Sequence, residues 1–286
     1  MSALPFRVDL KDKVAVVTGG SGVLGAAMCR ALATCGAKVA ILGRDREKAE
    51  SLAAQLERDG GIARGVSCNV VDRGSLEAAA AEIRGALGPC DLLINGAGGN
   101  HPKATAGQEY FDPNQAASGA PAETSFFDLD VAGFEFVFNL NLLGTVLPCQ
   151  VFGRQMLGRT GCSIINISSM SALRPLTKVA AYSAAKAAVN NLTQWLATHF
   201  AHSGIRVNAI APGFFITEQN RRLMIKDDGS HTARAQKVIA QTPMRRFGQP
   251  EELLGAMMWL ADAKSSGFVT GTIIAIDGGF SAYAGV

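Results

Sequence analysis

The stretch KVAVVTGGSGVLG, residues 13–25, decides how the rest of the chain is interpreted. Its first half is a short β-branched run typical of a buried strand, and its second half carries four glycines. Glycines at such a point let the backbone turn tightly, so that amide N–H groups at the start of the next helix can meet a pyrophosphate. The stretch lacks the Lys-Ser/Thr pair of a nucleoside-triphosphate loop. It therefore favours a dinucleotide, although a glycine-rich turn without a ligand fits the same letters.

Short apolar runs alternate with alanine-rich helical stretches along nearly the whole chain. This alternation predicts an α/β fold with a doubly wound, Rossmann-type parallel sheet of about seven strands and helices on both faces. We expect strands at residues 13–18, 37–42, 62–68, 91–95, 162–168, 205–211 and 272–276. We expect helices at residues 23–35, 45–58, 73–87, 131–158 with a break near Gly144, 180–203 and 250–262.

Residues 1–286 are expected to form one domain, because a single α/β domain of this size buries one large core. Two segments interrupt the alternation. Residues 99–130 are rich in Gly, Pro, Ala and Asn and predict an insertion beside the substrate, and residues 214–247 predict a lid. We expect both segments over the carboxyl edge of the sheet, where open α/β sheets bind ligands.

Composition and charge limit the possible partners. The chain is 48% hydrophobic with a net charge of +3 and no basic block, which argues against nucleic-acid and membrane-surface binding. Six cysteines without CxxC spacing argue against zinc and against a disulfide framework. Residues 1–13 carry charges where a signal peptide needs an apolar run, and the uncharged run 136–153 contains Asn, Pro and Gln. We therefore expect a soluble, cytoplasmic protein without a membrane span.

The end of the second predicted strand bears on which dinucleotide binds. A carboxylate at this place would hold the ribose diol of NAD, whereas this chain continues with Gly43, Arg44 and Asp45. The guanidinium fork of Arg44 matches the geometry of a 2′-phosphate. Asp45 is a natural N-cap for the helix that follows. We favour NADP(H), with NAD(H) as the alternative.

The segment NISSMSALRPLTKVAAYSAAK, residues 166–186, carries the candidate chemistry. Tyr182 and Lys186 stand four residues apart on a predicted helix and share one face. A tyrosine that exchanges a proton near neutral pH needs a pKa roughly 3 units below its usual value. A lysine charge about 5 Å away supplies about 3 kcal/mol of this, and the cationic nicotinamide can supply the rest. Ser169, at a strand end, can bond a substrate oxygen. By itself the Tyr/Lys pair is also compatible with two surface residues.

The order of these motifs resembles that of a short-chain dehydrogenase/reductase over essentially the whole chain. The matching motifs are TGGSGVLG at 18–25, NGAG at 95–98, NLLG at 141–144, Ser169, YSAAK at 182–186, APG at 211–213 and DGG at 277–279. The resemblance implies that Ser169 orients the reacting oxygen and that Tyr182 is the general acid/base. It further implies that Lys186 tunes the tyrosine and binds the nicotinamide ribose, and that Asn141 supports a proton relay through water.

The same resemblance implies a set of cofactor contacts and a quaternary structure. The contacts are Gly19, Ser21, Gly22, Val23, Leu24, Arg44, Asn69, Val70, Asn95, Ala97, Gly98, Tyr182, Lys186, Pro212, Gly213 and Thr217. Three positions depart from the family pattern: Val23 replaces a helix-opening glycine, Asn69 an aspartate that meets the adenine, and Gly96 an asparagine. None of them belongs to the reacting centre. The resemblance implies a homotetramer joined through the helices at 144–158 and 180–203.

Three segments are most similar to the bacterial D-mannonate oxidoreductase, or fructuronate reductase, branch: NHPK at 100–103, SMSALRPLT at 169–177 and PGFFITEQN at 212–220. This branch implies reversible hydride transfer between the nicotinamide and a keto or hydroxy sugar acid. Such a small-molecule substrate needs a cation for its carboxylate and several hydroxyl partners. We predict Arg174 as the first carboxylate partner, Lys103 as the second, and His101 and Asn100 as hydroxyl partners. No metal site is predicted.

Two other functions fit the same motifs. A short-chain reductase of another polyol, ketone or 3-oxoacyl substrate would use the same serine, tyrosine and lysine. A 3-oxoacyl thioester would also need an open basic groove, and the sequence has no dense basic cluster. A non-catalytic dinucleotide sensor would be expected to have lost the Tyr/Lys pair, which is intact here.

Overall fold

A computed structural model describes residues 8–114, 124–218 and 220–285. Within these ranges one seven-stranded parallel sheet has the strand order β3-β2-β1-β4-β5-β6-β7. The strands are β1 (Val14–Thr18), β2 (Lys38–Gly43), β3 (Ile62–Ser67), β4 (Leu92–Asn95), β5 (Cys162–Ile167), β6 (Ile205–Pro212) and β7 (Ile273–Ile276). Each predicted strand is confirmed to within one residue at either end. The order reverses between β1 and β4, and ligands of open α/β sheets bind at such a switch point.

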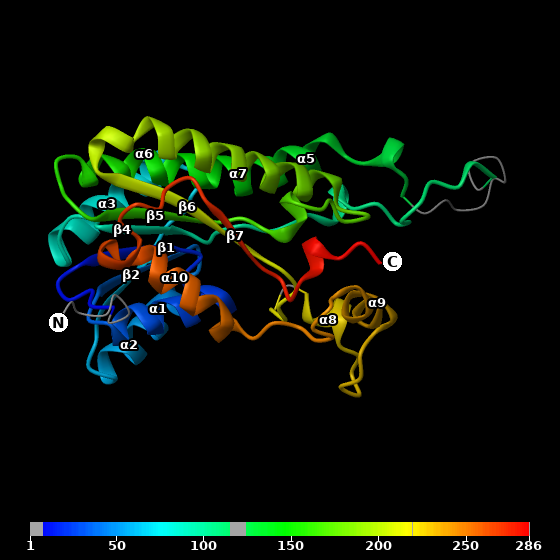
Figure 1. Cartoon of the computed structure of the whole chain (residues 1–286), viewed down its shortest axis with the longest axis horizontal. Coiled ribbons are helices and arrows are strands. Elements are labelled where there is room, and N and C mark those ends of the chain that lie inside the picture. The colour runs from blue at the N-terminus through cyan, green and yellow to red at the C-terminus, as the bar shows by residue number, and fades with distance from the viewer. Residues whose placement is uncertain (1–7, 115–123, 219, 286) are drawn as a thin grey trace.

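Helices cover both faces of the sheet (Figure 1). One face carries α1 (Val23–Thr34), α2 (Arg46–Arg58) and α10 (Leu254–Ala261), and the other carries α3 (Arg73–Ala86), α6 (Gly144–Met156) and α7 (Ala180–His199). The predicted helix at 250–262 is in fact a 3-10 turn, Pro250–Leu253, followed by α10 and a short α11 (Ala263–Ser266). The predicted helix at 180–203 ends at His199.

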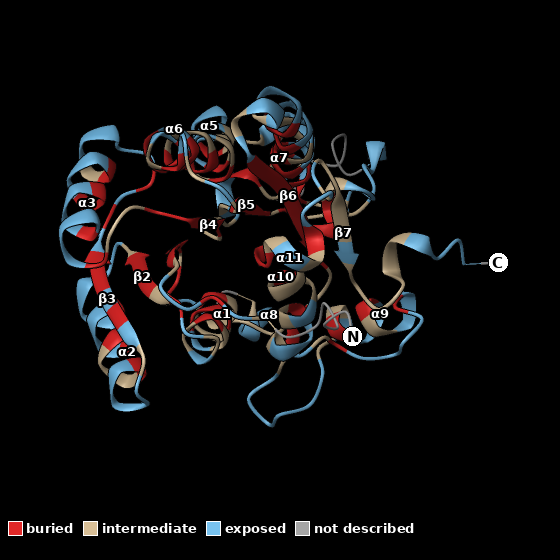
Figure 2. Ribbon diagram, turned by 60° about the vertical axis from the view of Figure 1, so that its left-hand side comes forward, coloured by how far each residue is buried: buried red, intermediate tan, exposed pale blue. Residues whose placement is uncertain are grey.

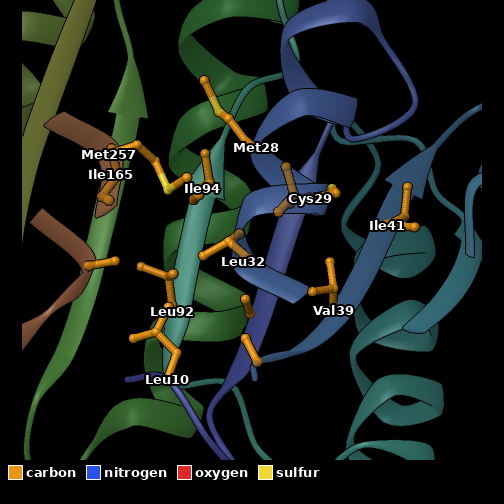
Figure 3. Packing of buried hydrophobic residues seen from close by; sticks show 14 of the residues in the cluster. Leu10, Met28, Cys29, Leu32, Val39, Ile41, Leu92, Ile94, Ile165 and Met257 are labelled. Atoms are coloured by element: carbon orange, nitrogen blue, oxygen red, sulfur yellow. The ribbon is translucent and has the colours of Figure 1, made fainter. Parts of the chain in front are cut away.

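The sheet and its two helical layers enclose two buried apolar clusters. Figure 3 shows the first cluster, in which Met28, Cys29 and Leu32 of α1 face the side chains of β2 and β4. The central strands are buried on both faces, which is why they are continuous apolar runs, and Figure 2 shows this burial along β4, β5 and β6. The six cysteines are free thiols, and burial raises the pKa of Cys29 to about 12, so its thiol is a packing group.

The helix predicted at 131–158 is interrupted as expected near Gly144. It consists of α5 (Val131–Phe138), a π-helical segment at Asn139–Leu143 and α6. By length and composition alone the run Val131–Met156 could cross a membrane, but half of its most apolar window is buried inside the fold. Core helices of globular proteins have the same composition. The run packs on α3, α7 and the sheet.

The two predicted irregular segments follow the carboxyl ends of β4 and β6, at the right of Figure 1. The described parts of the insertion, 99–114 and 124–130, contain the 3-10 turns Pro102–Ala104 and Phe126–Asp128. The lid segment contains α8 (Arg221–Met224) and α9 (Ala233–Gln241), which enclose a small apolar cluster of their own. Both segments therefore lie at the edge of the sheet where a ligand is expected.

Candidate active site

The glycine turn after β1 has backbone that other residues would not tolerate. Gly19 has a φ of +65°, and a Cβ on it would lie 3.0 Å from the backbone of Ala97. A Cβ on Gly25 would lie 2.3 Å from the carbonyl oxygen of Gly19. Gly22 is the N-cap of α1 and supplies no side-chain cap, so the first-turn N–H groups at Val23 and beyond are not bonded by a capping side chain. The turn fits a pyrophosphate at the helix N-terminus.

The end of β2 places Arg44 on the surface beside this turn. A Cβ on Gly43 would lie 2.9 Å from Oγ of Ser21, which shows how closely the two segments approach. Arg44 is exposed. The Asp45 carboxylate accepts a 3.1 Å hydrogen bond from the backbone N–H of Lys48 and caps α2, as its position suggested. Arg44 is therefore better placed than Asp45 to meet a group on the adenosine ribose.

Lys186 of α7 is held in the core beside the tyrosine ring. Its side chain is buried, and Nζ donates a 2.7 Å hydrogen bond to the carbonyl oxygen of Ile167 at the end of β5. Nζ also lies 5.7 Å from the centroid of the Tyr182 ring. Burial lowers the pKa of Lys186 to about 8 from its ordinary 10.5, because charging the amine there costs hydration. This carbonyl partner is a backbone group, for which the sequence carries no side-chain signal.

Tyr182 and Ser169 approach each other from α7 and from the end of β5. Burial raises the pKa of the Tyr182 phenol, and a hydrogen bond with the Ser169 hydroxyl opposes that shift. The lowering predicted from Lys186 together with a cationic nicotinamide stays a prediction, and in the chain alone the phenol pKa lies above its ordinary value. The physical reason is that desolvation of the phenolate outweighs the available stabilising contacts. A lowered pKa requires positive charge beyond what the chain supplies.

Asn141 anchors the loop that follows β4. Its Nδ2 donates 2.7 Å hydrogen bonds to the carbonyl oxygens of Gly99 and Val137, and its Oδ1 accepts a 3.2 Å bond from the N–H of Gly99. A Cβ on Gly98 would lie 2.8 Å from that Oδ1 and 3.1 Å from Nζ of Lys186. The π-helical segment, the glycine loop and Lys186 thus meet at one point. π-Bulges of this kind are frequent at functional sites.

Asn95, predicted as a cofactor contact, has its side chain in the core. It is 1% exposed, and its Nδ2 donates a 2.9 Å hydrogen bond to Oδ1 of Asn166. Asn166 in turn donates a 2.9 Å bond to Oγ1 of Thr193 in α7. The Asn95 side chain therefore links β4 to β5 and α7, and its contact with the cofactor stays a prediction. Thr18, not predicted as a site residue, accepts hydrogen bonds from the N–H groups of Gly96 and Ala97 at 3.1 and 3.2 Å.

The remaining predicted cofactor contacts follow the carboxyl ends of several strands. Asn69 is exposed after β3, with Oδ1 accepting a 3.3 Å hydrogen bond from the N–H of Val71, and Val70 is buried. Pro212 ends β6, and a Cβ on Gly213 would lie 2.5 Å from Cα of Asp277. This contact brings the APG and DGG motifs together. The N–H of Thr217 donates a 2.8 Å bond to Oδ1 of Asn220 at the start of the lid.

Three of the predicted substrate residues lie together in the insertion, and each has a partner there. Nδ2 of Asn100 donates a 2.9 Å hydrogen bond to Oγ1 of Thr105. Nδ1 of His101 accepts a 3.2 Å bond from the N–H of Lys103, and Nζ of Lys103 lies 3.2 Å from a carboxylate oxygen of Asp130. These contacts fold the loop. They leave the three side chains engaged with the protein itself.

The insertion nevertheless lies against α7, which carries Tyr182 and Lys186. Ala104 is fully buried and belongs to the same apolar cluster as Ala181, Ala185 and Tyr182. Arg174, the first predicted carboxylate partner, is exposed, and its Nε donates a 3.0 Å hydrogen bond to the carbonyl oxygen of Ser281 near the C-terminal end. The insertion therefore adjoins the tyrosine, while Arg174 is tied to a different segment. Across the described ranges, no group of three His, Cys, Asp or Glu side chains could hold a metal ion.

Comparison with known sequences identifies relatives over the full length. The model of the short chain dehydrogenase family matches residues 13–228. An uncharacterized oxidoreductase of Bacillus subtilis, UxuB, is 54% identical over 283 residues, which cover 99% of this chain and 100% of the relative. D-threitol dehydrogenase of Mycolicibacterium smegmatis is 35% identical and covers 96% of this chain and 95% of its own.

Solved structures agree with these relatives. A protein of Haemophilus influenzae provisionally named D-mannonate oxidoreductase, crystallised with NAD, superposes with a TM-score of 0.91 at 47% identity, covering 99% and 100% of the two chains. A gluconate 5-dehydrogenase from Burkholderia cenocepacia in complex with NADP and tartrate has a TM-score of 0.81 at 30% identity, covering 98% and 99%. The resemblance to a short-chain dehydrogenase/reductase that the motifs suggested is confirmed.

Proposed function

The chain belongs to the short-chain dehydrogenase family, and we propose that it transfers hydride reversibly between NAD(P)(H) and a keto or hydroxy sugar acid of the D-fructuronate/D-mannonate type. The observation that supports this most strongly is the assembly of Ser169, Tyr182 and Lys186 beside a glycine turn suited to a dinucleotide. For the substrate, support comes from the 47% identical structure provisionally named D-mannonate oxidoreductase.

Each catalytic side chain has a defined task in the proposed reaction. When bound, the nicotinamide supplies the hydride to the carbonyl carbon or accepts it from the alcohol. The hydroxyl of Ser169 donates a hydrogen bond to the substrate oxygen and orients it beside the phenol. In reduction, the Tyr182 hydroxyl gives its proton to that oxygen, and in oxidation the phenolate takes the proton back. The ammonium of Lys186 stabilises the phenolate and can bond a ribose hydroxyl.

Cofactor choice depends on the adenosine end of the site. We propose that NADP(H) is favoured, because Arg44 is exposed beside the glycine turn and Asp45 is engaged as a helix cap. The Haemophilus structure holds NAD, and the Burkholderia structure holds NADP. Activity should therefore be measured with both NADP(H) and NAD(H).

We propose that the protein is cytoplasmic and forms a homotetramer, and large exposed apolar side chains on α7 and directly after α6 support the homotetramer. Trp195 is 58% exposed on α7, and Leu157, which follows α6, is 55% exposed. Exposed aromatic and aliphatic groups of this size are typical of surfaces that join subunits. Light scattering coupled to size-exclusion chromatography measures the assembly directly: a mass four times that of the chain is expected, and a monomer contradicts the proposal.

The substrate proposal is tested by NADPH and NADH consumption with D-fructuronate, D-fructose, a simple ketone and a 3-oxoacyl thioester, and by oxidation of D-mannonate and D-threitol. We expect the highest kcat/KM for D-fructuronate and D-mannonate. A higher value for D-threitol favours a polyol dehydrogenase, for which the Mycolicibacterium relative is an argument. Cofactor binding without turnover of any substrate favours a non-catalytic sensor.

A further inference from the structure

Three cations from two separate segments surround one carboxylate of the insertion. Glu109 is hydrogen-bonded by Nζ of Lys237, which lies in α9 of the lid segment. Nζ of Lys178, which precedes the catalytic helix, donates to the carbonyl oxygen of Gly107 in the same loop. The third cation is Arg234, also in α9. We call Lys178, Arg234 and Lys237 the cation cluster.

The cation cluster carries more positive charge than Glu109 neutralises. The hydrogen bond from Lys237 is the main cause that lowers the pKa of Glu109, and the charges of Lys178 and Arg234 lower it further. All three cations therefore lower the pKa of the same carboxyl group. Nε of Arg234 is buried and has no hydrogen-bond partner among the residues that the structure describes. A buried guanidinium N–H without an acceptor is costly, and a second carboxylate would supply one.

Backbone strain at Lys178 points to a functional reason for its position. Its φ is +73°, in the left-handed region that residues other than glycine seldom adopt. The N–H of Ala106 donates a 2.8 Å hydrogen bond to the carbonyl oxygen of Lys178, which helps to hold this conformation against the insertion. Strained residues of this kind concentrate at binding and catalytic sites. Lys178 precedes Tyr182 by only four residues.

We propose that the cation cluster binds the carboxylate of the sugar-acid substrate, and that Glu109 is an internal carboxylate which the substrate's carboxylate replaces. This inference rests on the proposed function. In the proposed complex, the lid, the insertion and the segment before α7 meet around the carboxylate of the substrate. The two carboxylate partners predicted from the sequence lie in other contacts, Lys103 with Asp130 and Arg174 with the carbonyl oxygen of Ser281. The hydroxyl groups of the substrate would then extend from the cation cluster toward Tyr182.

Substitutions of Glu109 and of Lys237 are expected to change the KM for D-fructuronate in opposite directions. Lys237→Met and Arg234→Met should each raise the KM for D-fructuronate by about 10- to 100-fold, the range for one lost charge-assisted hydrogen bond. Glu109→Gln should lower that KM, by about 3-fold or more, because it removes the competing carboxylate. The uncharged analogue D-fructose, which carries CH₂OH in place of the carboxylate, should show less than about a 3-fold change in KM with any of these variants.

A merely structural pair behaves differently. If Glu109 and Lys237 only fasten the lid to the insertion, Glu109→Gln and Lys237→Met change the KM in the same direction for both substrates, and the inference is overturned. It is also overturned if the selective effect on D-fructuronate appears in Arg174→Met instead. Lys178→Asn, which tolerates the left-handed backbone, tests the third cation. Arg222→Met, at an exposed position of α8, is the matched control.

The outcome separates this inference from the proposed function. If the wild-type protein reduces D-fructose or a ketone but not D-fructuronate, the sugar-acid function fails and the inference falls with it. If D-fructuronate is reduced and its KM is unchanged in the cluster variants, only the inference fails. Circular dichroism of each variant shows whether it is folded before the kinetic comparison is made.

Discussion

Gly98 lies so close to Lys186 that a Cβ on the glycine would stand 3.1 Å from the lysine Nζ and 2.8 Å from Oδ1 of Asn141. Gly98→Ala should therefore displace the lysine or the asparagine, and we expect kcat to fall at least about 10-fold, with a loss of about 1–3 kcal/mol in the free energy of unfolding. Gly85→Ala in α3 is the control, since a Cβ there meets nothing within 4 Å. Equal kinetics for the two variants would show that this close approach has no catalytic role.

The hydroxyl of Tyr182 is the proposed proton donor. Tyr182→Phe removes the exchangeable proton and keeps the ring that packs against the apolar cluster of Ala104, Ala181 and Ala185. We expect kcat to fall by about 10²- to 10⁴-fold or more, while the dissociation constant of NADPH, measured by fluorescence titration, changes by less than about 3-fold. Retention of more than about a tenth of the activity would exclude the phenol as the acid/base.

Arg44 is proposed to bind the 2′-phosphate of NADP(H). Arg44→Asp should reduce the kcat/KM ratio of NADPH to NADH by about 10-fold or more, because it replaces a cation by a repelling anion. The neighbouring Arg46 is a suitable control, since it already pairs with Glu50 at 2.7 Å within α2. A ratio that changes as much in Arg46→Asp as in Arg44→Asp would mean that only the general charge of the helix start matters.

The buried amine of Lys186 makes stability depend on pH. Its folded-state pKa of about 8 lies below the ordinary 10.5, so the unfolded chain binds the proton more tightly and folding is disfavoured below pH 8. Raising the pH from about 8 to 10.5, between the folded and the ordinary pKa, should stabilise the wild type by up to about 3 kcal/mol relative to Lys186→Met. Urea denaturation of both proteins at pH 7 and pH 10 measures the difference. A constant difference would contradict the low pKa.

The chain of amides from Asn95 to Asn166 and Thr193 is expected to support the fold rather than the cofactor. Asn95→Ala leaves the buried Asn166 without its donor and should cost about 1–3 kcal/mol in the free energy of unfolding. The dissociation constant of NADPH should stay within about 3-fold of the wild-type value. Unchanged stability together with 10-fold weaker binding would restore the cofactor role that the motif suggested.

Much of the fold follows from local sequence patterns. The strands of the sheet are apolar runs bounded by turn residues, so their ends are predictable to within a residue. The glycine turn and the Tyr/Lys spacing are equally local. The break near Gly144 was predictable, but its π-helical form was not, because it involves hydrogen bonds between Asn141 and the distant Gly99.

The candidate substrate contacts were less predictable because they depend on contacts distant in sequence. Arg174 stands close to Ser169 in the sequence, yet its guanidinium bonds the carbonyl of Ser281. Lys178 and Lys237 are far apart in the chain and meet around Glu109 only when the lid and the insertion fold. The raised pKa of Tyr182 in the chain alone was unpredictable for a related reason, since burial is a property of the assembled core.

The π-helical segment between α5 and α6 contains one residue more than a regular helix would need. Deleting a single residue within 139–143 would let the two helices merge into one uninterrupted α-helix. The wide turn takes up the extra residue, so the side chains of α6 would keep their faces relative to α5, but the turn that presents Asn141 to Gly99 would be lost. Insertions and deletions are usually tolerated in loops, but here the length of a helix is fixed to the residue by the asparagine that it must present to Gly99.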